Sequence, residues 1–277
     1  MRTNHILGES VRLLVLGAIA IIFIYPFWWM VVNSLNSAAE IFGKPRLLPV
    51  SWRWTNYLEI FQVQPFARHY LNTLYVAILG TAGNIIVASL SGYAFARLRF
   101  PGRNGLFLLL LTGMMMPIEV EIIPLYFEMQ KFHALDTLTP LVLIPMFCSQ
   151  GAFSAFMFRQ FFVTMPDELE EAARLDGLHP IGIYTRIMFP LSQPIVASAA
   201  ILTFLSIWNS YLEPLVFLSD IQKFTLPLSL ANFNDSYGLP QWHLQLAATT
   251  LSVIPIMAVY SFFQEKICDA MVNTGMK

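Results

Sequence analysis

Six long apolar segments constrain this chain more than any other feature of its sequence. A helix of about 20 apolar residues spans the roughly 30 Å hydrocarbon core of a bilayer, and it satisfies its own backbone hydrogen bonds there. The segments cover approximately residues 13–33, 71–96, 105–127, 138–158, 195–217 and 246–264. The sequence therefore predicts an all-α membrane protein with six transmembrane helices.

Composition agrees with this fold class and excludes others. Charged residues make up 12% of the chain, about half of the roughly one quarter found in soluble domains. The net charge of −1 gives no electrostatic basis for binding nucleic acid. Cys148 and Cys268 have neither a second cysteine nor a histidine at metal-ligand spacing, so we expect no disulfide and no metal site. The five histidines fall in predicted loops and termini, which favours surface positions.

The first apolar segment is predicted to stay in the mature protein. The apolar core of a signal peptide has about 7–15 residues, and this segment is longer. It also contains Pro26, Trp28 and Trp29, and tryptophans are enriched where a span meets the membrane interface. We interpret it as an uncleaved first span.

Basic residues predict the orientation of the spans. Six spans place both termini on one side, and cytoplasmic loops carry an excess of Lys and Arg. Ten basic residues fall on the side of the termini and six on the other, which accounts for all 16. The ten include a tight cluster in one short loop, formed by Arg97, Arg99 and Arg103. Both termini and the loop 159–194 are therefore predicted to be cytoplasmic.

The loop 159–194 contains the start and stop signals of a short helix. Pro166 suits a first helical turn. The carboxylates among residues 167–171 fall where the helix dipole favours negative charge. Gly177 can adopt the left-handed conformation that ends a helix. A second short helix is expected to begin at Pro180 and to be ended by Pro190 and Pro194.

A partner protein could use two features of this first helix. Ala172 and Ala173 would let another surface approach closely, and the carboxylates could pair with an arginine across an interface. A solvated amphipathic loop helix is the alternative on spacing alone.

The same loop resembles the EAA loop of membrane subunits in binding-protein-dependent ABC importers. The matching residues are Pro166, Glu168, Leu169, Glu170, Glu171, Ala172, Ala173, Asp176, Gly177, Tyr184, Ile187, Pro190, Leu191 and Pro194. Leu178 departs from the small residue that is usual after the glycine. The pattern is long, spaced and placed between two spans, so the resemblance is specific.

Further stretches resemble the maltose-type carbohydrate permeases of that family, from about residue 70 to the C-terminus. They are SGYAFARLRFPGRN (91–104), IIPLYFEM (122–129), WNSYLEPL (208–215) and FTLPLSLANF (224–233). Glu213 stands where the family more often has an apolar or aromatic residue.

The resemblance implies the transmembrane domain of a type I ABC importer, with residues 1–277 as a single permease domain and core spans over about 71–264. Its coupling helix would dock on a cytoplasmic ATPase and transmit the closure of two ATPases. The residues implied in that contact are Glu170, Glu171, Ala172, Ala173, Asp176 and Gly177. Glu171 would pair with an ATPase arginine or with neighbouring polar groups, and Gly177 would set the bend.

The implied partners are a second permease, two ATPase subunits, an extracytoplasmic solute-binding protein and the lipid of a bacterial inner membrane. This chain has no G-x-x-x-x-G-K-[ST] phosphate loop, so we do not expect it to be an enzyme that hydrolyses ATP alone. ATP and Mg²⁺ would be bound by the ATPase subunits, and no cofactor is expected on this chain.

Polar residues within the spans are candidates for a solute path. Ionisable groups are costly in a membrane and are functional hypotheses there. Glu119 lies between two prolines of the third segment, and Asn209, Tyr211 and Glu213 lie on the fifth. The alternatives are carboxylates at the headgroup level, which we favour for the neighbouring Glu121, and hydrogen bonding between helices.

Two other functions compete with the importer. An ion-coupled secondary transporter would use Glu119, Glu121 or Glu213 as coupling carboxylates and would need no EAA loop. A membrane scaffold would have no transport role. The sequence leaves the solute open among oligosaccharides, monosaccharides and glycerol phosphate esters.

Overall fold

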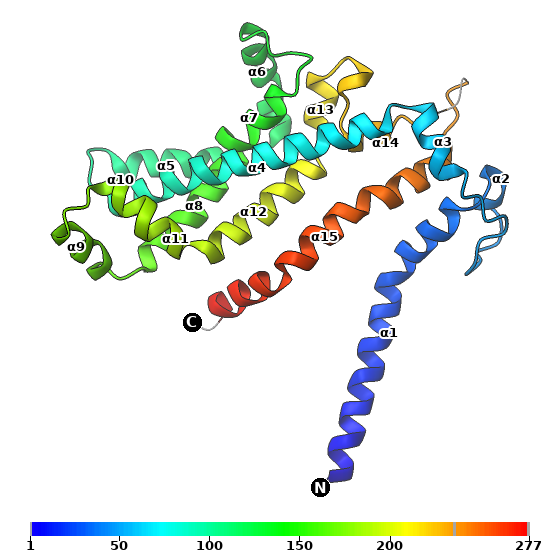
Figure 1. The fold of residues 1–277 in the computed structure, drawn as a ribbon, viewed down its shortest axis with the longest axis horizontal. Coiled ribbons are helices and arrows are strands. Elements are labelled where there is room, and N and C mark those ends of the chain that lie inside the picture. The colour runs from blue at the N-terminus through cyan, green and yellow to red at the C-terminus, as the bar shows by residue number, and fades with distance from the viewer. Residues whose placement is uncertain (1, 235–236, 276–277) are drawn as a thin grey trace. The chain divides into compact units, whose positions relative to one another are not determined.

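The computed structural model describes residues 2–234 and 237–275, and the chain divides into two compact units. Unit 1 comprises residues 1–66 and 230–254, and unit 2 comprises residues 67–229 and 255–277. The elements of the described residues are helices, apart from one isolated β-bridge between Asn234 and Pro240 (Figure 1). The predicted all-α fold class is confirmed.

Three helices are each long and apolar enough to cross a membrane. They are residues Arg12–Ser34 of α1 (Arg2–Ser34), α4 (Phe66–Arg97) and residues Trp242–Ser261 of α15 (Trp242–Gly275). Three helix pairs pass the same test together but bend at a short break. They are α5 (Arg103–Met114) with α6 (Ile118–Lys131), α7 (Thr139–Phe147) with α8 (Ser149–Thr164), and residues Pro180–Leu191 with α12 (Gln193–Trp208). Counting each pair as one span gives the six predicted spans.

The breaks within the first two of these pairs were not predicted, although a proline marks the α5–α6 break. The α5–α6 pair bends by 104° next to Pro117.

The sequence predicts a fifth span that continues to residue 217, whereas α12 ends at Trp208 and α13 (Leu212–Phe217) is a separate helix. Pro214 lacks the N–H of a helix, and its ring would clash with the Ser210 carbonyl four residues earlier. A continuous helix through this segment is therefore strained.

The second short helical segment that the sequence predicts begins at Pro180 and ends at Leu191, before the fifth span. The chain is helical from Pro180 to Leu191 and bends by 77° before α12. Pro194 lies in the first turn of α12, where a missing N–H costs no helical hydrogen bond. The segment consists of α10 (Pro180–Ile183), the π-helix η1 (Tyr184–Met188) and α11 (Phe189–Leu191).

Unit 1 joins the end of α1 to the short helices α2 (Ala38–Ile41) and α3 (Asn56–Val63). The buried Asn56 amide donates to the carbonyl oxygens of Ser34 (2.8 Å) and Asn36 (3.0 Å). It thereby satisfies carbonyls that the end of a helix leaves without partners. By contrast, 6% of the apolar window of α1 is buried, so this span presents an apolar surface along its length.

Unit 2 contains α5 to α13 and nearly all of α4, with α9 (Glu168–Leu175) and α13 at opposite ends (Figure 1). Within it, α8 packs against α5, α7 and α12. A cluster of buried side chains connects α4, α8 and the segment after α9. Its large members are Tyr93, Phe158, Phe162, Ile183, Tyr184 and Met188. The segment after α13 contains η2 (Ile221–Lys223) and α14 (Leu226–Leu230).

His69 corrects the prediction of surface histidines. It lies in the first turns of α4 and is fully buried. Its two ring nitrogens lie 2.7 Å from Ser229 Oγ and 2.6 Å from the Ile221 carbonyl oxygen. The ring therefore ties α4 to the segment after α13, a partnership about 150 residues apart in sequence that local pattern does not reveal.

Candidate functional site

The predicted short helix of the loop 159–194 exists as α9 (Glu168–Leu175). It follows an extended residue, Met165, and carries three carboxylates in its first turn. Gly177 has φ +81°. The Leu178 and Gly177 amides donate to the carbonyls of Ala173 and Arg174, both at 3.0 Å. This is the hydrogen-bond pattern in which a left-handed glycine ends a helix.

The predicted contact residues divide between the two faces of α9. Glu171, Ala172, Asp176 and Gly177 are exposed, and Leu175 beside them has an exposed fraction of 89%. Glu170 and Ala173 are buried, on the opposite face. In this structure the surface that a partner can reach therefore excludes two of the six predicted residues. They face the same side because they are three positions apart.

Arg97, the last residue of α4, grips the start of α9. Its guanidinium donates to the Phe162 carbonyl from Nε (3.0 Å) and Nη2 (2.6 Å), and also to the Met165 carbonyl. It pairs with the Asp167 carboxylate, and Nε lies 3.8 Å from Glu170 Oε1. The Arg97 side chain is 7% exposed. We call Arg97, its two carbonyl partners, Asp167 and Glu170 the Arg97 clamp.

Glu170 completes the clamp from the other side. Its carboxylate is 8% exposed and lies between Arg97 and Arg174, whose Nη2 is 3.2 Å from Oε2. Breaking a buried ion pair by removing one partner is strongly destabilising, because the other charge stays buried. The clamp therefore fixes the position of α9 relative to the ends of α4 and α8.

The buried aromatic cluster supports the clamp. Tyr93 of α4 contacts Phe162 edge to face, with ring centroids 5.9 Å apart. The Tyr184 hydroxyl lies 2.7 Å from Ser89 Oγ, so the π-helix after α9 is also bound to α4. Near the same end, the Arg159 guanidinium stacks 4.0 Å above the Phe107 ring. These contacts join α4, α5, α8 and α9 into one packed end of unit 2.

Sequence analysis missed the role of Arg97, which it used to orient the spans. The partners of Arg97 lie 65 to 73 residues further along the chain, from Phe162 to Glu170. No local spacing connects them, so the sequence offers no direct signal for the clamp.

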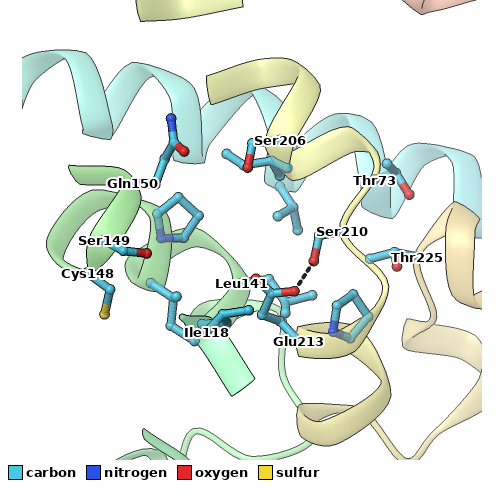
Figure 2. A pocket seen from close by; sticks show the side chains of 15 residues that line it. Thr73, Ile118, Leu141, Cys148, Ser149, Gln150, Ser206, Ser210, Glu213 and Thr225 are labelled. Carbon is cyan, nitrogen blue, oxygen red and sulfur yellow. Dashed lines mark hydrogen bonds between the residues drawn. The ribbon is translucent and has the colours of Figure 1, made fainter. Parts of the chain in front are cut away.

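A cavity of about 240 Å³ lies near the other end of unit 2 (Figure 2). Its wall comes from α4, the α7–α8 break, α12 and α13. Glu213 lines it and accepts a hydrogen bond from the Ser210 hydroxyl. The cavity is therefore the place where one predicted path residue meets other polar groups.

The other predicted path residues lie elsewhere. Glu119 is exposed on α6, Tyr211 has an exposed fraction of 43%, and the exposed Asn209 amide donates to its own helix at Leu205 O (2.8 Å). Of the remaining polar residues of the cavity, the sequence drew attention only to Ser210, as part of the stretch WNSYLEPL (208–215). The others come from separate stretches around residues 73, 149–150, 206 and 225, so no local spacing connects them.

A second polar junction fixes the loops beyond α6 and α13. Asp136 accepts hydrogen bonds from the Ser219 (3.0 Å) and Asp220 (2.9 Å) amides, and Lys223 Nζ lies 2.6 Å away. These partners, the Lys223 hydrogen bond first, lower the pKa of Asp136 to about 2. The same pairing raises the pKa of Lys223.

These features define a class of protein: a multi-span helical membrane protein with an exposed short helix fixed to the end of a span. The chain belongs to the family of binding-protein-dependent transport system inner membrane components, which matches residues 84–271. It is therefore a membrane permease subunit of a binding-protein-dependent importer, a transport component and not an enzyme. The family implies no cofactor on this chain, and in general a partner permease, an ATPase and a solute-binding protein.

Individual relatives cover nearly the whole chain. The diacetylchitobiose uptake system permease protein NgcG of Streptomyces coelicolor is 30% identical over 91% of this chain and 83% of its own length. The sn-glycerol-3-phosphate transport system permease protein UgpE of Pectobacterium atrosepticum is 34% identical over 95% and 94%. A solved bacterial ABC transporter involved in import of the acidic polysaccharide alginate matches with a TM-score of 0.81 and 25% identity, covering 96% and 98%.

Proposed function

We propose that this chain is one of two permeases in an ATP-driven importer of a sugar or sugar-like solute, and that α9 is its coupling helix. The observation that carries the proposal is the Arg97 clamp. It holds a short helix with exposed Glu171, Ala172 and Asp176 rigidly against the end of a span. A helix fixed in this way can be pushed by a partner without bending away.

The clamp also supports a route for the push. One guanidinium binds carbonyls of the α8 end and carboxylates at the start of α9, and it belongs to α4. A displacement of α9 therefore moves the ends of α4 and α8 together. ATP and Mg²⁺ act on the ATPase subunits, and this chain supplies the mechanical connection.

Orientation follows from the same proposal. If α9 docks on cytoplasmic ATPases, the loop 159–194 and both termini are cytoplasmic in a bacterial inner membrane. The excess of basic residues on that side supports this orientation. Residues 1–277 would then work as a single transmembrane permease domain. Its partners would be a second permease, two ATPase subunits and an extracytoplasmic binding protein.

The solute class is proposed from relatives with different solutes. Their names refer to diacetylchitobiose, sn-glycerol 3-phosphate and alginate. All three solutes carry several hydroxyl groups. We therefore propose a sugar or sugar-like solute for this chain.

The test reverses one charge on the exposed face of α9. Glu171→Lys is expected to weaken association with the ATPase subunits at least about tenfold, because like charges then face each other across the contact. Co-purification of the ATPase and uptake in membrane vesicles measure this. Glu128→Lys is the matched control, an exposed glutamate on α6. Full ATPase association and full uptake with Glu171→Lys would remove α9 from the coupling role.

A further inference from the structure

The cavity of about 240 Å³ occupies the region where two spans of unit 2 are broken. One break separates α7 from α8 at Cys148, and the other separates α12 from α13 at residues 209–211. Backbone without helical hydrogen bonds is tolerated at membrane depth only against protein or a polar cavity. Breaks of this kind mark binding positions in other transporters, so the cavity is a candidate ligand-binding site.

The polar side chains in its wall are hydrogen-bonding groups, and only one of them is a carboxylate. The hydroxyls, the amide and the carboxylate are supplied by Thr73, Ser149, Gln150, Ser206, Ser210, Glu213 and Thr225 (Figure 2). Apolar side chains such as Ile118, Leu141 and Ile144 form the rest of the wall. Hydroxyls and amides beside apolar surface can bind a neutral polyhydroxylated molecule.

Thr225 provides an observation that points to a missing partner. The residue is 3% exposed, and its hydroxyl oxygen has no hydrogen-bond partner among the described residues. A buried polar atom without a partner is unfavourable. Figure 2 shows Thr225 and Gln150 at opposite sides of the cavity. A ligand hydroxyl in the cavity would supply the missing bond.

Gln150 is held in one orientation by a buried relay. Its amide Nε2 donates to Thr203 Oγ1 (3.2 Å), which donates to Asn84 Oδ1 (3.3 Å), and Asn84 Nδ2 donates to the Pro145 carbonyl (2.6 Å). Because the amide nitrogen is used, the carbonyl oxygen of Gln150 stays available as an acceptor. The relay also fixes α4 to the α7–α8 break.

Charge narrows the class of ligand. Glu213 is the one ionisable acid among the residues of this wall, and the wall contains no Lys, Arg or His. Ser210 engages one carboxylate oxygen of Glu213. Two adjacent hydroxyls of a polyol can donate to a carboxylate, whereas a phosphate or a second carboxylate is repelled by it.

We infer that this subunit itself binds one neutral unit of the solute that carries adjacent hydroxyls, in the cavity between the two breaks. This inference rests on the proposed importer function, because the importer would bring the solute to the cavity. The volume lies below the roughly 300–1,000 Å³ of sites for drug-sized ligands, which fits one sugar residue. Glu213 and Gln150 accept from the sugar hydroxyls, and Thr225 pairs with another. Uronates and sugar phosphates are excluded.

Cys148 supplies a direct readout, because it lines the same cavity and is half-buried. The complete importer in nanodiscs, with Cys268→Ser in this chain, is alkylated with N-ethylmaleimide, and mass spectrometry follows Cys148. Glucose and N-acetylglucosamine are the neutral probes, and glucose 6-phosphate is the anionic probe matched to glucose. The rate is measured without nucleotide and with ATP held unhydrolysed.

A saturating neutral sugar is expected to slow alkylation at least about threefold in one of the two states, following simple occupancy, and glucose 6-phosphate is expected to have no effect. Glu213→Gln and Thr225→Val should each raise the sugar concentration needed, about tenfold for Glu213 because its hydrogen bonds are charge-assisted. Ser198→Ala removes a hydroxyl of α12 that lies outside the cavity wall and bonds to its own helix, so it should change nothing. The inference is overturned if neither sugar changes the alkylation rate in either state. It is also overturned if the sugars protect Cys148 as well in Glu213→Gln and Thr225→Val as in the wild type.

Failure of this inference is distinguishable from failure of the proposed function. If Glu171→Lys abolishes ATPase association while the sugars leave Cys148 alkylation unchanged, the importer proposal stands and the cavity is not a sugar site. If Glu171→Lys has no effect, the coupling proposal fails whatever the cavity binds.

Discussion

The two ends of unit 2 are built from different chemistry. At the α9 end a buried guanidinium, two carboxylates and two backbone carbonyls meet in the Arg97 clamp. At the cavity end hydroxyls, an amide and the single carboxylate of Glu213 face open space between broken helices. Charge-assisted hydrogen bonds are roughly twice as strong as neutral ones, so the first end is suited to transmit force. The cavity end is suited to bind and release a ligand.

One helix belongs to both ends. Thr73 near the start of α4 lines the cavity, and Arg97 at its end forms the clamp. At 1.5 Å per residue, about 36 Å of helix separates them. Since α4 is continuous over this length, a displacement at the clamp reaches the cavity wall without a hinge in between.

The largest effect should come from removing the guanidinium. Arg97→Met leaves Glu170 buried without its partner at that side, and we expect a loss of about 3–5 kcal/mol in the free energy of unfolding. Thermal unfolding of the purified chain measures this, and vesicle uptake should fall below detection.

Arg99→Met is the control, because Arg99 is exposed two residues away. The double variant Arg97→Met with Glu170→Gln should regain part of the stability but not the uptake. Equal stability of Arg97→Met and Arg99→Met would show that the clamp carries no more than a surface contact does.

A smaller effect should follow where α4 passes close to α8. A Cβ at Gly92 of α4 would lie 2.5 Å from Phe158 Cβ and 2.8 Å from the Arg159 backbone nitrogen of α8. Gly92→Ala must push α4 and α8 apart, at about 1–3 kcal/mol. Gly105→Ala on α5, with open space around it, is the control. Uptake should fall more than ATPase association does, and a fully active Gly92→Ala would mean that close α4–α8 contact is dispensable.

The end of α9 should show a still smaller effect. Gly177→Ala places a Cβ in the left-handed region at φ +81°, which costs about 1 kcal/mol. Gly102 has φ +77° and open space, so Gly102→Ala has matched strain outside the loop 159–194. Both variants should lose similar stability by thermal unfolding. Solute transported per ATP hydrolysed should drop in Gly177→Ala alone, and an equal drop in both would attribute it to strain.

The smallest effect concerns pH at the cavity end. The folded pKa of Asp136, about 2, lies below its ordinary value, so its contribution to stability is complete above the unfolded pKa. That contribution is lost as pH falls through the folded pKa. The unfolding midpoint should therefore lack any Asp136-dependent change between about pH 8 and about pH 5. Comparison of the wild type with Asp136→Asn across this range checks it, and a difference that grows towards pH 5 contradicts the assignment.

Local sequence patterns predicted much of the α9 end of unit 2. The acidic first turn, Ala172 and the left-handed Gly177 are short-range signals, and α9 formed where they indicated. Arg97 could not be predicted as a clamp, because its partners come from a different part of the chain. The burial of Glu170 and Ala173 likewise depends on how α9 rests on α4 and α8.

The cavity end was less predictable. The apolar run 195–217 hid the break after Trp208, although Pro214 is a signal for it. Glu213 stood out as a carboxylate within a span. Thr225 and Gln150 did not, because an isolated hydroxyl or amide in sequence says nothing about the cavity that it lines.

The central claim is that the exposed face of α9 meets an ATPase. A photoreactive amino acid at position 172 in the complete importer tests it directly, with the same residue at position 128 on α6 as the reference. The account predicts a cross-link from position 172 to the nucleotide-hydrolysing subunit and none from position 128. A cross-link from position 172 to the extracytoplasmic binding protein, or to lipid alone, would contradict it.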